Sequence, residues 1–176
     1  MDISEFFDQN RKVAIAFSGG ADSAYLLYEA VKSNVDLTAY YVKSQFQPEF
    51  EYKDALRLSE ELAVRLKVIE VDVLSCDSIV SNTALRCYEC KKVIFSHILN
   101  EAFADGYNII LDGTNASDDI NDRPGMKALL EYKVLSPLRI CGITKDQVRK
   151  RSKEAGIFTW NKPAYACLAT RVKTNE

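Results

Sequence analysis

The sequence predicts an α/β fold, with an open, mostly parallel sheet and helices on both faces. Short apolar runs of strand length alternate with stretches of helical periodicity, as in βαβ units. The apolar runs are nearly continuous, which is typical of parallel strands buried on both faces. Polar segments that contain Gly, Ser, Asp and Thr follow two of these runs directly. In a parallel sheet such segments lie at the carboxyl edge, where ligands bind.

The N-terminal part of the chain predicts a helix, a strand and a second helix. Residues 2–10 place their apolar side chains at helical spacing behind Asp2, which can cap the helix. Residues 12–17 read KVAIAF, a run that predicts a buried strand. This run continues through Ser18-Gly19-Gly20-Ala21-Asp22-Ser23 into a helix expected over 22–33.

The middle of the chain repeats this alternation. Residues 37–42 predict the second strand, and residues 67–73 (KVIEVDV) alternate in the manner of a third. Between them, residues 49–66 predict a helix. The apolar residues expected to share one face of that helix are Ala55, Leu58, Leu62 and Leu66.

The second half of the chain follows the same plan. A helix is expected over 87–104, closed by Gly106 where a left-handed C-cap belongs, and a buried strand over 107–111. A capping box begins a helix predicted over 144–156. Residues 157–176 lack clear periodicity, and we expect them to form a cysteine-bearing loop segment beside the sheet.

Length and composition narrow the class of protein. A chain of 176 residues predicts a single domain, 1–176, with a real core. The net charge of −2 gives no overall electrostatic footprint for nucleic acid, so we do not expect nucleic-acid binding. No apolar stretch approaches the roughly 20 residues that span a bilayer. The acidic N-terminus does not resemble a signal peptide, and we expect a cytoplasmic protein without membrane contact.

The five cysteines indicate thiol chemistry rather than disulfides, because the cytosol keeps thiols reduced. Cys87 and Cys90 form a CxxC pair, which inside cells is more often a metal or redox site. A structural zinc site completed by Cys76 or His97 is an alternative. His97 is the chain's only histidine, which disfavours a Ser/His/Asp catalytic triad. Cys76 and Cys141 are expected to be small core residues.

The segment Ser18–Ser23 has the chemistry of a phosphate cradle. Two adjacent glycines let the backbone approach an anion, and the Ser18 and Ser23 hydroxyls can donate hydrogen bonds. The helix that follows directs free N–H groups and its positive end to the same place. The Walker pattern GxxxxGK[ST] is absent, so this motif positions no lysine at the β- and γ-phosphates.

SGGADS after a buried strand resembles the signature of the PP-loop, or N-type ATP pyrophosphatase, superfamily. That resemblance implies the adenine nucleotide alpha hydrolase-like fold and cleavage of ATP between its α- and β-phosphates. It implies that five residues of the loop hold the pyrophosphate, that Asp22 helps to hold Mg²⁺, and that the second strand ends beside the adenine at Val42. Gly113 and Thr114 follow another buried strand and are expected to contact the nucleotide. The five loop residues are Ser18, Gly19, Gly20, Asp22 and Ser23.

Three further strings resemble the ATP-dependent sulfur transferases of the LarE family. They are RCYECK from Arg86, DGTNASDDINDRPG from Asp112 and KPAYACLATR from Lys162. The resemblance runs from about Lys12 to Arg171. It implies an enzyme that adenylylates a carboxylate of pyridinium-3,5-biscarboxylate mononucleotide, releases pyrophosphate and inserts sulfur, in nickel-pincer nucleotide biosynthesis. The expected partner is therefore a small carboxylated nucleotide.

The same resemblance assigns the catalytic sulfur to Cys167. Some family members give up the sulfur of this cysteine and leave dehydroalanine. Others carry two additional cysteines and bind a [4Fe–4S] cluster whose open iron can hold a sulfide. This chain has Cys87 and Cys90 as well as Cys167, and three thiolates suffice for such a cluster. We therefore favour the cluster-bearing variant.

Charged residues complete the expected site. Asp118 and Asp119 are candidates to hold Mg²⁺ or to order their loop. Arg86, Arg123 and Arg171 are candidates to bind the substrate phosphate or carboxylates, because a guanidinium grips such groups at two points.

The alternatives to sulfur transfer onto a small molecule are a PP-loop tRNA thiolation enzyme, a non-catalytic ATP-binding iron–sulfur module and an amide synthetase. Residues 145–176 contain eight Lys or Arg and three Asp or Glu, a local excess of +5 that favours the tRNA alternative. The overall charge disfavours it, because tRNA binding depends on phosphate neutralisation. Family members usually continue past the ACLxxR string into a smaller domain that supports oligomers. This chain ends at Glu176, and the sequence leaves open whether it forms a homo-oligomer.

Overall fold

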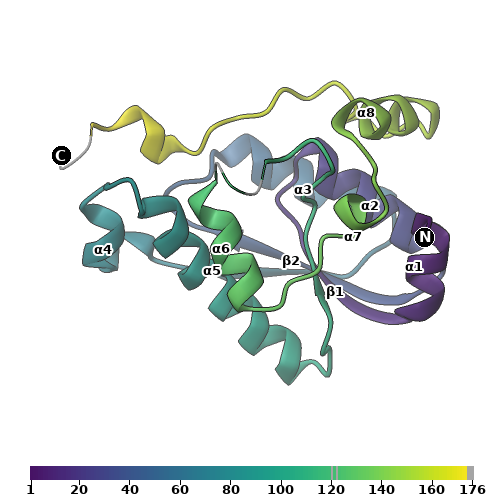
Figure 1. The fold of residues 1–176 in the computed structure, drawn as a ribbon, viewed down its shortest axis with the longest axis horizontal. Helices are drawn as coiled ribbons and strands as arrows, with labels where there is room; N and C mark the ends of the chain where they lie inside the picture. The colour runs from purple at the N-terminus through teal and green to yellow at the C-terminus, as the bar shows by residue number, and fades with distance from the viewer. Residues whose placement is uncertain (120, 122, 174–176) are drawn as a thin grey trace.

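The structure is a computed structural model that describes residues 1–119, 121 and 123–173. Within these residues, four strands form one sheet in the order β3-β2-β1-β4, and every neighbouring pair is parallel. The strands are β1 (Lys12–Ala16), β2 (Asp36–Lys43), β3 (Leu66–Glu70) and β4 (Ile110–Leu111) (Figure 1). The predicted open parallel sheet is confirmed.

Helices follow the strands in the alternation that the sequence predicts. The elements α4, α6 and α7 were not expected; α4 and α7 have four residues each and are too short to show periodicity. None of the helices in the described residues is both long enough and apolar enough to cross a membrane. The α-helices are α1 (Ile3–Gln9), α2 (Ala21–Lys32), α3 (Glu49–Glu61), α4 (Asp77–Val80), α5 (Arg86–Ala104), α6 (Pro124–Glu131), α7 (Pro137–Ile140) and α8 (Lys145–Glu154). The 3₁₀ helices are η1 (Val73–Ser75) and η2 (Leu168–Arg171).

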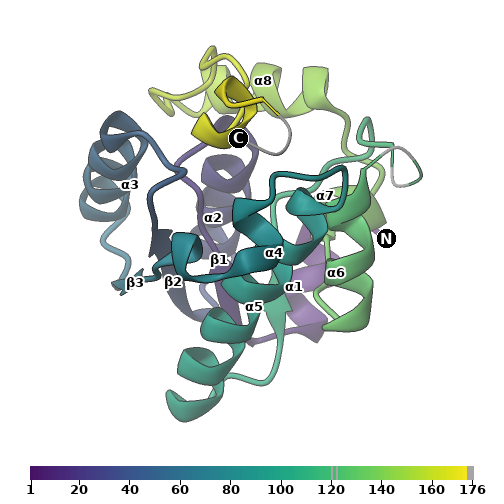
Figure 2. The same ribbon diagram turned by 90° about the vertical axis from the view of Figure 1, so that its left-hand side faces the viewer.

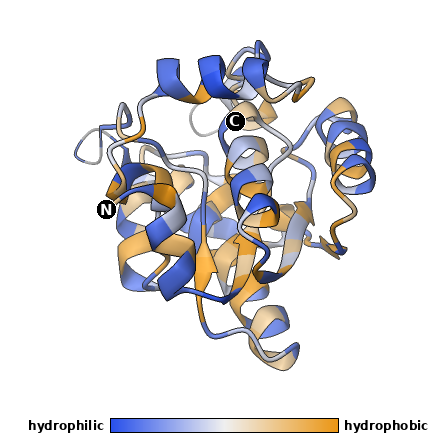
Figure 3. Cartoon of the chain, turned by 90° about the vertical axis from the view of Figure 1, so that its right-hand side faces the viewer, coloured by the Kyte–Doolittle hydropathy of each residue, from blue (hydrophilic) through white to orange (hydrophobic). Residues whose placement is uncertain are grey.

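The sheet separates two hydrophobic cores, because successive side chains of a strand point to opposite faces. Val13 and Ile15 of β1 pack into the first core with residues of α1, α2, α3, α7 and α8. Ala14 of β1 and Tyr40 of β2 pack into the second core with residues of α4, α5 and α6. Helices therefore cover both faces, as predicted (Figure 2). The apolar strands lie between these layers (Figure 3).

Local capping signals fix several helix ends where the sequence placed them. The Asp2 side chain accepts from the Glu5 backbone N–H, and the Glu5 side chain accepts from the Asp2 N–H. The same reciprocal box joins Thr144 and Gln147 at the start of α8. Gly106, after α5, has the left-handed φ of 87° that the sequence predicts.

The helix predicted over 49–66 is wrong at its C-terminal end. It stops at Glu61, and Ala63 takes a left-handed φ of 53°, which turns the chain into β3. Leu66 then pairs with Ala39 of the sheet, so it does not share the helical face of Leu58. Apolar spacing alone could not separate the last turn of α3 from the first residue of the next strand.

Two predicted strands are also shorter than expected. The strand predicted over 67–73 ends at Glu70, because Asp72 caps a 3₁₀ turn by accepting from the Leu74 N–H, and Val73 belongs to η1. The strand predicted over 107–111 is reduced to Ile110–Leu111, the part that pairs with β1.

The described part of the C-terminal segment, residues 157–173, is irregular except for η2, as expected. It runs from α8 towards the side of the molecule where α4 lies (Figure 1). Lys162 contacts the loop after β1, and the Leu168 N–H donates to Phe46 O in the loop after β2 at 3.0 Å. The segment therefore crosses the carboxyl edge of the sheet.

A matched pair of substitutions on α3 tests how the first core is built. Leu58 is 1% exposed and Leu56 is 36% exposed. Leu58→Ala should lower the free energy of unfolding by about 2–5 kcal/mol, because it leaves a cavity in the core. Leu56→Ala should lower it by about 1 kcal/mol or less. Urea unfolding measures both, and equal losses would contradict the placement of α3.

Candidate active site

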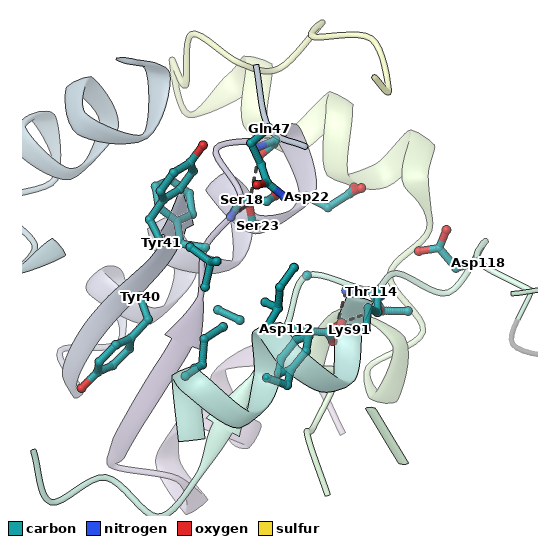
Figure 4. Close-up of a pocket in the computed structure, with 18 residues that line it drawn as sticks. Ser18, Asp22, Ser23, Tyr40, Tyr41, Gln47, Lys91, Asp112, Thr114 and Asp118 are labelled. Carbon is teal, nitrogen blue, oxygen red and sulfur yellow. Dashed lines mark hydrogen bonds between the residues drawn. The ribbon is translucent and has the colours of Figure 1, made fainter. Parts of the chain in front are cut away.

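A pocket of about 310 Å³ opens at the carboxyl ends of β1, β2 and β4, beneath α5 (Figure 4). It lies where the strand order reverses, since β2 is on one side of β1 and β4 is on the other. Ligands of open parallel sheets bind at this position. Its lining residues are Ala16, Phe17, Ser18, Gly20, Asp22, Ser23, Tyr40, Tyr41, Val42, Gln47, Lys91, Ile94, Phe95, Ile98, Asp112, Gly113, Thr114 and Asp118.

The loop between β1 and α2 is organised around two serines. The hydroxyl oxygens of Ser18 and Ser23 are 3.1 Å apart, and Ser23 Oγ donates to Gly20 O. Gly20 is the N-cap of α2 and supplies no side-chain cap. The first backbone N–H groups of α2 therefore face the pocket without a competing side-chain acceptor, as anion binding at a helix N-terminus requires.

Gly19 is required by both its backbone angle and its surroundings. Its φ is 76°, in the left-handed region, and a Cβ atom here would lie 2.6 Å from Glu51 O of α3. A side chain would push the loop away from α3 and change the direction of the following N–H groups.

Gly113 allows the loop after β4 to touch the start of α2. A Cβ atom on Gly113 would lie 2.8 Å from the Ser23 backbone nitrogen. Asp112, which is buried, organises this loop by accepting hydrogen bonds from Thr114 Oγ1 and Ser136 Oγ, both at 2.6 Å. The structure thus brings Gly113 and Thr114 to the pocket, and Asp112 acts as their internal support.

Asp22 lies in the first turn of α2 and lines the pocket. Its Oδ2 is 2.6 Å from Lys145 Nζ, at the start of α8. Its Oδ1 is buried and has no hydrogen-bond partner among the described residues. One carboxylate oxygen is therefore neutralised, and the other is left as an acceptor.

Lys162 connects the C-terminal segment to the same loop. Its Nζ donates to Gly19 O at 3.0 Å and lies 2.8 Å from Asp54 Oδ2 of α3. The side chain is 10% exposed, so this contact is shielded from water. The segment that contains Cys167 is thus attached directly to the loop Ser18–Ser23.

The opposite wall of the pocket is formed by the end of β2. Val42 and Tyr40 belong to the second core, and Tyr41 belongs to the first. Burial raises the pKa of the Tyr41 hydroxyl, which has no hydrogen-bond partner among the described residues. Together with Phe95 and Ile98 of α5, these residues give one half of the pocket an apolar surface suited to a planar base.

Three cysteines gather where α5 begins. Cys87 is exposed, whereas Cys90 and Cys167 are partly buried. Cys90 and Cys167 both pack against the second core, as does Cys76. Burial, together with the nearby Cys167 and Cys87 thiols, raises the pKa of the Cys90 thiol to about 11. The structure therefore brings the three predicted cysteines into one neighbourhood.

Across the described residues, no group of three or more His, Cys, Asp or Glu is close enough to hold a metal ion. The iron–sulfur site and the alternative zinc site both stay predictions. Cys141 packs against the first core, on the other face of the sheet.

The three expected arginines have different surroundings. Arg123 is exposed and forms an ion pair with Asp118, with 2.9 Å between Nη1 and Oδ1. Arg171 is exposed in η2. Arg86 is part-buried and donates to Asn82 Oδ1 and to Ala169 O. Arg86 thus contacts the segment that carries Cys167.

Comparison with known proteins identifies relatives. No family model matches the chain. It is 34% identical, over 92% of its length, to pyridinium-3,5-bisthiocarboxylic acid mononucleotide synthase of Lactiplantibacillus plantarum, covering 59% of that protein. The chain is therefore a homologue of this synthase. An uncharacterized protein of Methanocaldococcus jannaschii is 33% identical over 96% of the chain, covering 64% of its own length.

The chain spans about six tenths of the length of these two relatives. Weaker similarity extends to a tRNA-specific 2-thiouridylase of Thermotoga petrophila, at 24% identity over 86% of the chain and 54% of that protein. An NMN synthetase structure from Francisella tularensis has the same fold, with a TM-score of 0.71 at 20% identity over 92% of this chain and 70% of that one. The predicted PP-loop fold is confirmed.

Sequence reasoning missed two residues that contact the loop Ser18–Ser23 at this pocket, Lys145 and Lys162. The motif SGGADS supplies no lysine, yet the fold brings both cations to it from distant parts of the chain. Lys145 follows the capping residue Thr144, and Lys162 begins the string KPAYACLATR. Both lysines stand in segments that the sequence analysis singled out, but neither segment shows which loop its lysine contacts.

Substitutions of Gly19 and Gly156 form a matched pair that tests the close contact between the loop Ser18–Ser23 and α3. Both glycines have left-handed φ angles, 76° and 73°, but a Cβ at Gly156 would meet nothing within 4 Å. At either position, Ala in the left-handed conformation should lower the free energy of unfolding by about 1–2 kcal/mol relative to Gly. Gly19→Ala should cost about 1–3 kcal/mol more in urea unfolding, from the clash with Glu51 O, and should weaken ATP binding. Equal losses of stability in both variants would contradict the contact.

Proposed function

We propose that this chain carries the nucleotide-binding and sulfur-donor parts of an ATP-dependent sulfur transferase. It activates a carboxylate of a pyridinium-type mononucleotide by adenylylation and replaces the activated oxygen with sulfur. The printed activity of the Lactiplantibacillus relative supports the substrate class. The observation that carries the proposal is the direct attachment of the Cys167 string to the phosphate loop through Lys162 and Gly19.

The first step joins AMP to the substrate. The base occupies the apolar half of the pocket beside Val42, and the pyrophosphate end occupies the loop Ser18–Ser23. A carboxylate oxygen of the substrate attacks the α-phosphorus, and pyrophosphate leaves. The N-terminus of α2 stabilises the charge on the leaving group, because its free N–H groups and positive end face this loop.

The second step forms the carbon–sulfur bond. In the route without a cluster, the Cys167 thiolate attacks the carbonyl carbon of the acyl adenylate, and AMP leaves with the former carboxylate oxygen. Thiolates are intrinsically strong nucleophiles for such activated acyl groups. Removal of the Cys167 Cα proton then breaks its Cβ–S bond, which leaves a thiocarboxylate on the product and dehydroalanine in the chain.

Asp22 fits a role in holding Mg²⁺. Its Oδ1 is a buried oxygen acceptor without a partner among the described residues, and Mg²⁺ prefers carboxylate and phosphate oxygens. Bound there with ATP, Mg²⁺ would neutralise phosphate charge. Asp118 lines the same pocket, but its Oδ1 is paired with Arg123. Asp22 is therefore the better supported of the two.

Cys87, Cys90 and Cys167 supply the donor set of a [4Fe–4S] cluster with one open iron. Their shared neighbourhood and the thiol chemistry support this assignment. Cluster binding would draw the three sulfur atoms closer than they are in this structure. A cluster would supply an exchangeable sulfide as the transferred atom and spare the sulfur of Cys167.

Arg123 and Arg171 are the proposed contacts for the anionic groups of the substrate. Both side chains are exposed. Arg171 lies four residues after Cys167, which places a guanidinium near the sulfur donor. Such a cation can bind a phosphate or carboxylate at two points.

Replacement of the donor cysteine separates sulfur transfer from ATP chemistry. Cys167→Ala should retain pyrophosphate release with a pyridinium biscarboxylate mononucleotide and should abolish the thiolated product. The matched control is Cys141→Ala, since Cys141 packs on the opposite face of the sheet. Mass spectrometry of product and pyrophosphate assays give both readouts. Thiolated product from Cys167→Ala would refute the proposed role of this cysteine.

Iron analysis of anaerobically purified protein tests the source of the sulfur. We expect about four iron and four sulfide per chain, with absorbance near 400 nm, from a [4Fe–4S] cluster. Cys87→Ser, Cys90→Ser and Cys167→Ser should each lose them, whereas Cys76→Ser should not. Iron-free protein whose Cys167 loses the mass of H₂S after turnover would assign the sulfur to the cysteine itself.

A further inference from the structure

Two side chains at the α4–α5 junction fasten the Cys167 segment. Asn82 Nδ2 donates to Val172 O at 2.8 Å and to Lys173 O at 3.0 Å. Arg86 Nη1 donates to Ala169 O at 3.2 Å. The two side chains are joined to each other, because Arg86 Nη1 also donates to Asn82 Oδ1 at 2.5 Å. Four hydrogen bonds therefore form one connected clamp.

Asn82 is built into this position by the backbone. It follows α4, is 7% exposed and has a left-handed φ of 48°, a conformation that Asn tolerates better than most residues. The turn directs its amide towards the backbone of residues 172–173. Both donor hydrogen bonds of this buried amide go to one distant segment, and they are expensive to break, so they help to fix that segment.

The segment has little core packing of its own to fix it. Within its described part after Lys162, Ala169 is the buried residue, while Tyr165 and Val172 are about half exposed. Besides the clamp, the Leu168 N–H donates to Phe46 O, and the Tyr165 ring packs edge-on against Phe50. Cys167 itself packs only partly buried against the second core, so the polar contacts to the backbone are needed to hold it in place.

Arg86 links the clamp to the CxxC pair. It precedes Cys87, and its Nη2 is 3.5 Å from Cys87 Sγ. One guanidinium thus contacts the first cysteine of the pair and the backbone two residues after Cys167. We propose that Asn82 and Arg86 are positioning residues that hold residues 169–173 against α5 and keep Cys167 beside Cys87 and Cys90. The role of Asn82 and Arg86 in sulfur transfer rests on the function proposed above, whereas the hydrogen bonds of the clamp do not depend on it.

Thiol cross-linking tests the clamp in the full chain. A short bismaleimide adds to two thiols without any redox step, and peptide mass spectrometry measures the rate at which Cys167 is joined to Cys87 or Cys90. Asn82→Gly removes the amide and keeps the left-handed backbone free of strain. It should lower this rate by about tenfold, because three of the four hydrogen bonds of the clamp are lost. The melting temperature should fall by only about 2–6 °C, and ATP affinity should stay close to that of the unchanged chain.

Two conservative variants separate the clamp from other roles. Asn82→Asp keeps the acceptor for Arg86 but loses both donors to residues 172–173, so it should also slow cross-linking. Arg86→Lys keeps a cation for an anionic substrate but loses the geometry that joins Asn82 Oδ1 to Ala169 O, and it should slow cross-linking too. The matched control is Ser81→Ala, which removes a local bond to Asp77 O on α4 and touches nothing in the segment.

Unchanged cross-linking in Asn82→Gly and Arg86→Lys would overturn the clamp, whatever the enzyme does. Because the assay uses neither ATP turnover nor iron, a chain without sulfur transfer can still show the clamp. Conversely, loss of cross-linking with full thiolated product would show that the clamp exists but does not position Cys167 for the reaction. Reduced product at unchanged pyrophosphate release in Asn82→Gly is the expected result.

Discussion

The site depends on one close backbone approach, that of Gly113 to Ser23. These residues follow β4 and begin α2, and no Cβ fits between them. Because β1 and β4 are neighbours in a parallel sheet, their carboxyl ends must meet, and this contact closes the floor of the pocket. The free N–H groups of α2 then face a cavity walled by β2 and α5 rather than open solvent. The phosphate binding proposed for the loop Ser18–Ser23 depends on that arrangement.

The C-terminal segment makes this pocket part of a larger site. Lys162 attaches its beginning to the phosphate loop, and Asn82 and Arg86 hold its end. Cys167 lies between these attachments. A thiol on a segment with so little buried surface would otherwise sample many positions, and each attachment reduces that conformational entropy. Lys162 also joins the loop Ser18–Ser23 directly to the segment that bears the proposed sulfur donor.

Local interactions explain which parts of the fold could be predicted. The caps at Asp2 and Thr144 and the left-handed Gly106 depend on residues a few positions apart, so the sequence displays them. The errors arose where local patterns overlap. Leu66 continues the apolar spacing of α3, but the turn at Ala63 and the pairing with β2 place it in the sheet. Pairing between strands is a long-range term that periodicity does not contain.

The sequence by itself determined the parallel α/β fold, the loop SGGADS after its first strand and the resemblance to a known sulfur transferase, because these depend on short strings and their order. Only the tertiary structure decided which side chains complete the site. Lys145 and Lys162 reach Asp22 and Gly19 across more than 100 residues. Arg86, a candidate to bind substrate, also holds the backbone after Cys167. Such contacts form only when the sheet brings the carboxyl ends of its strands together, and no local pattern encodes them.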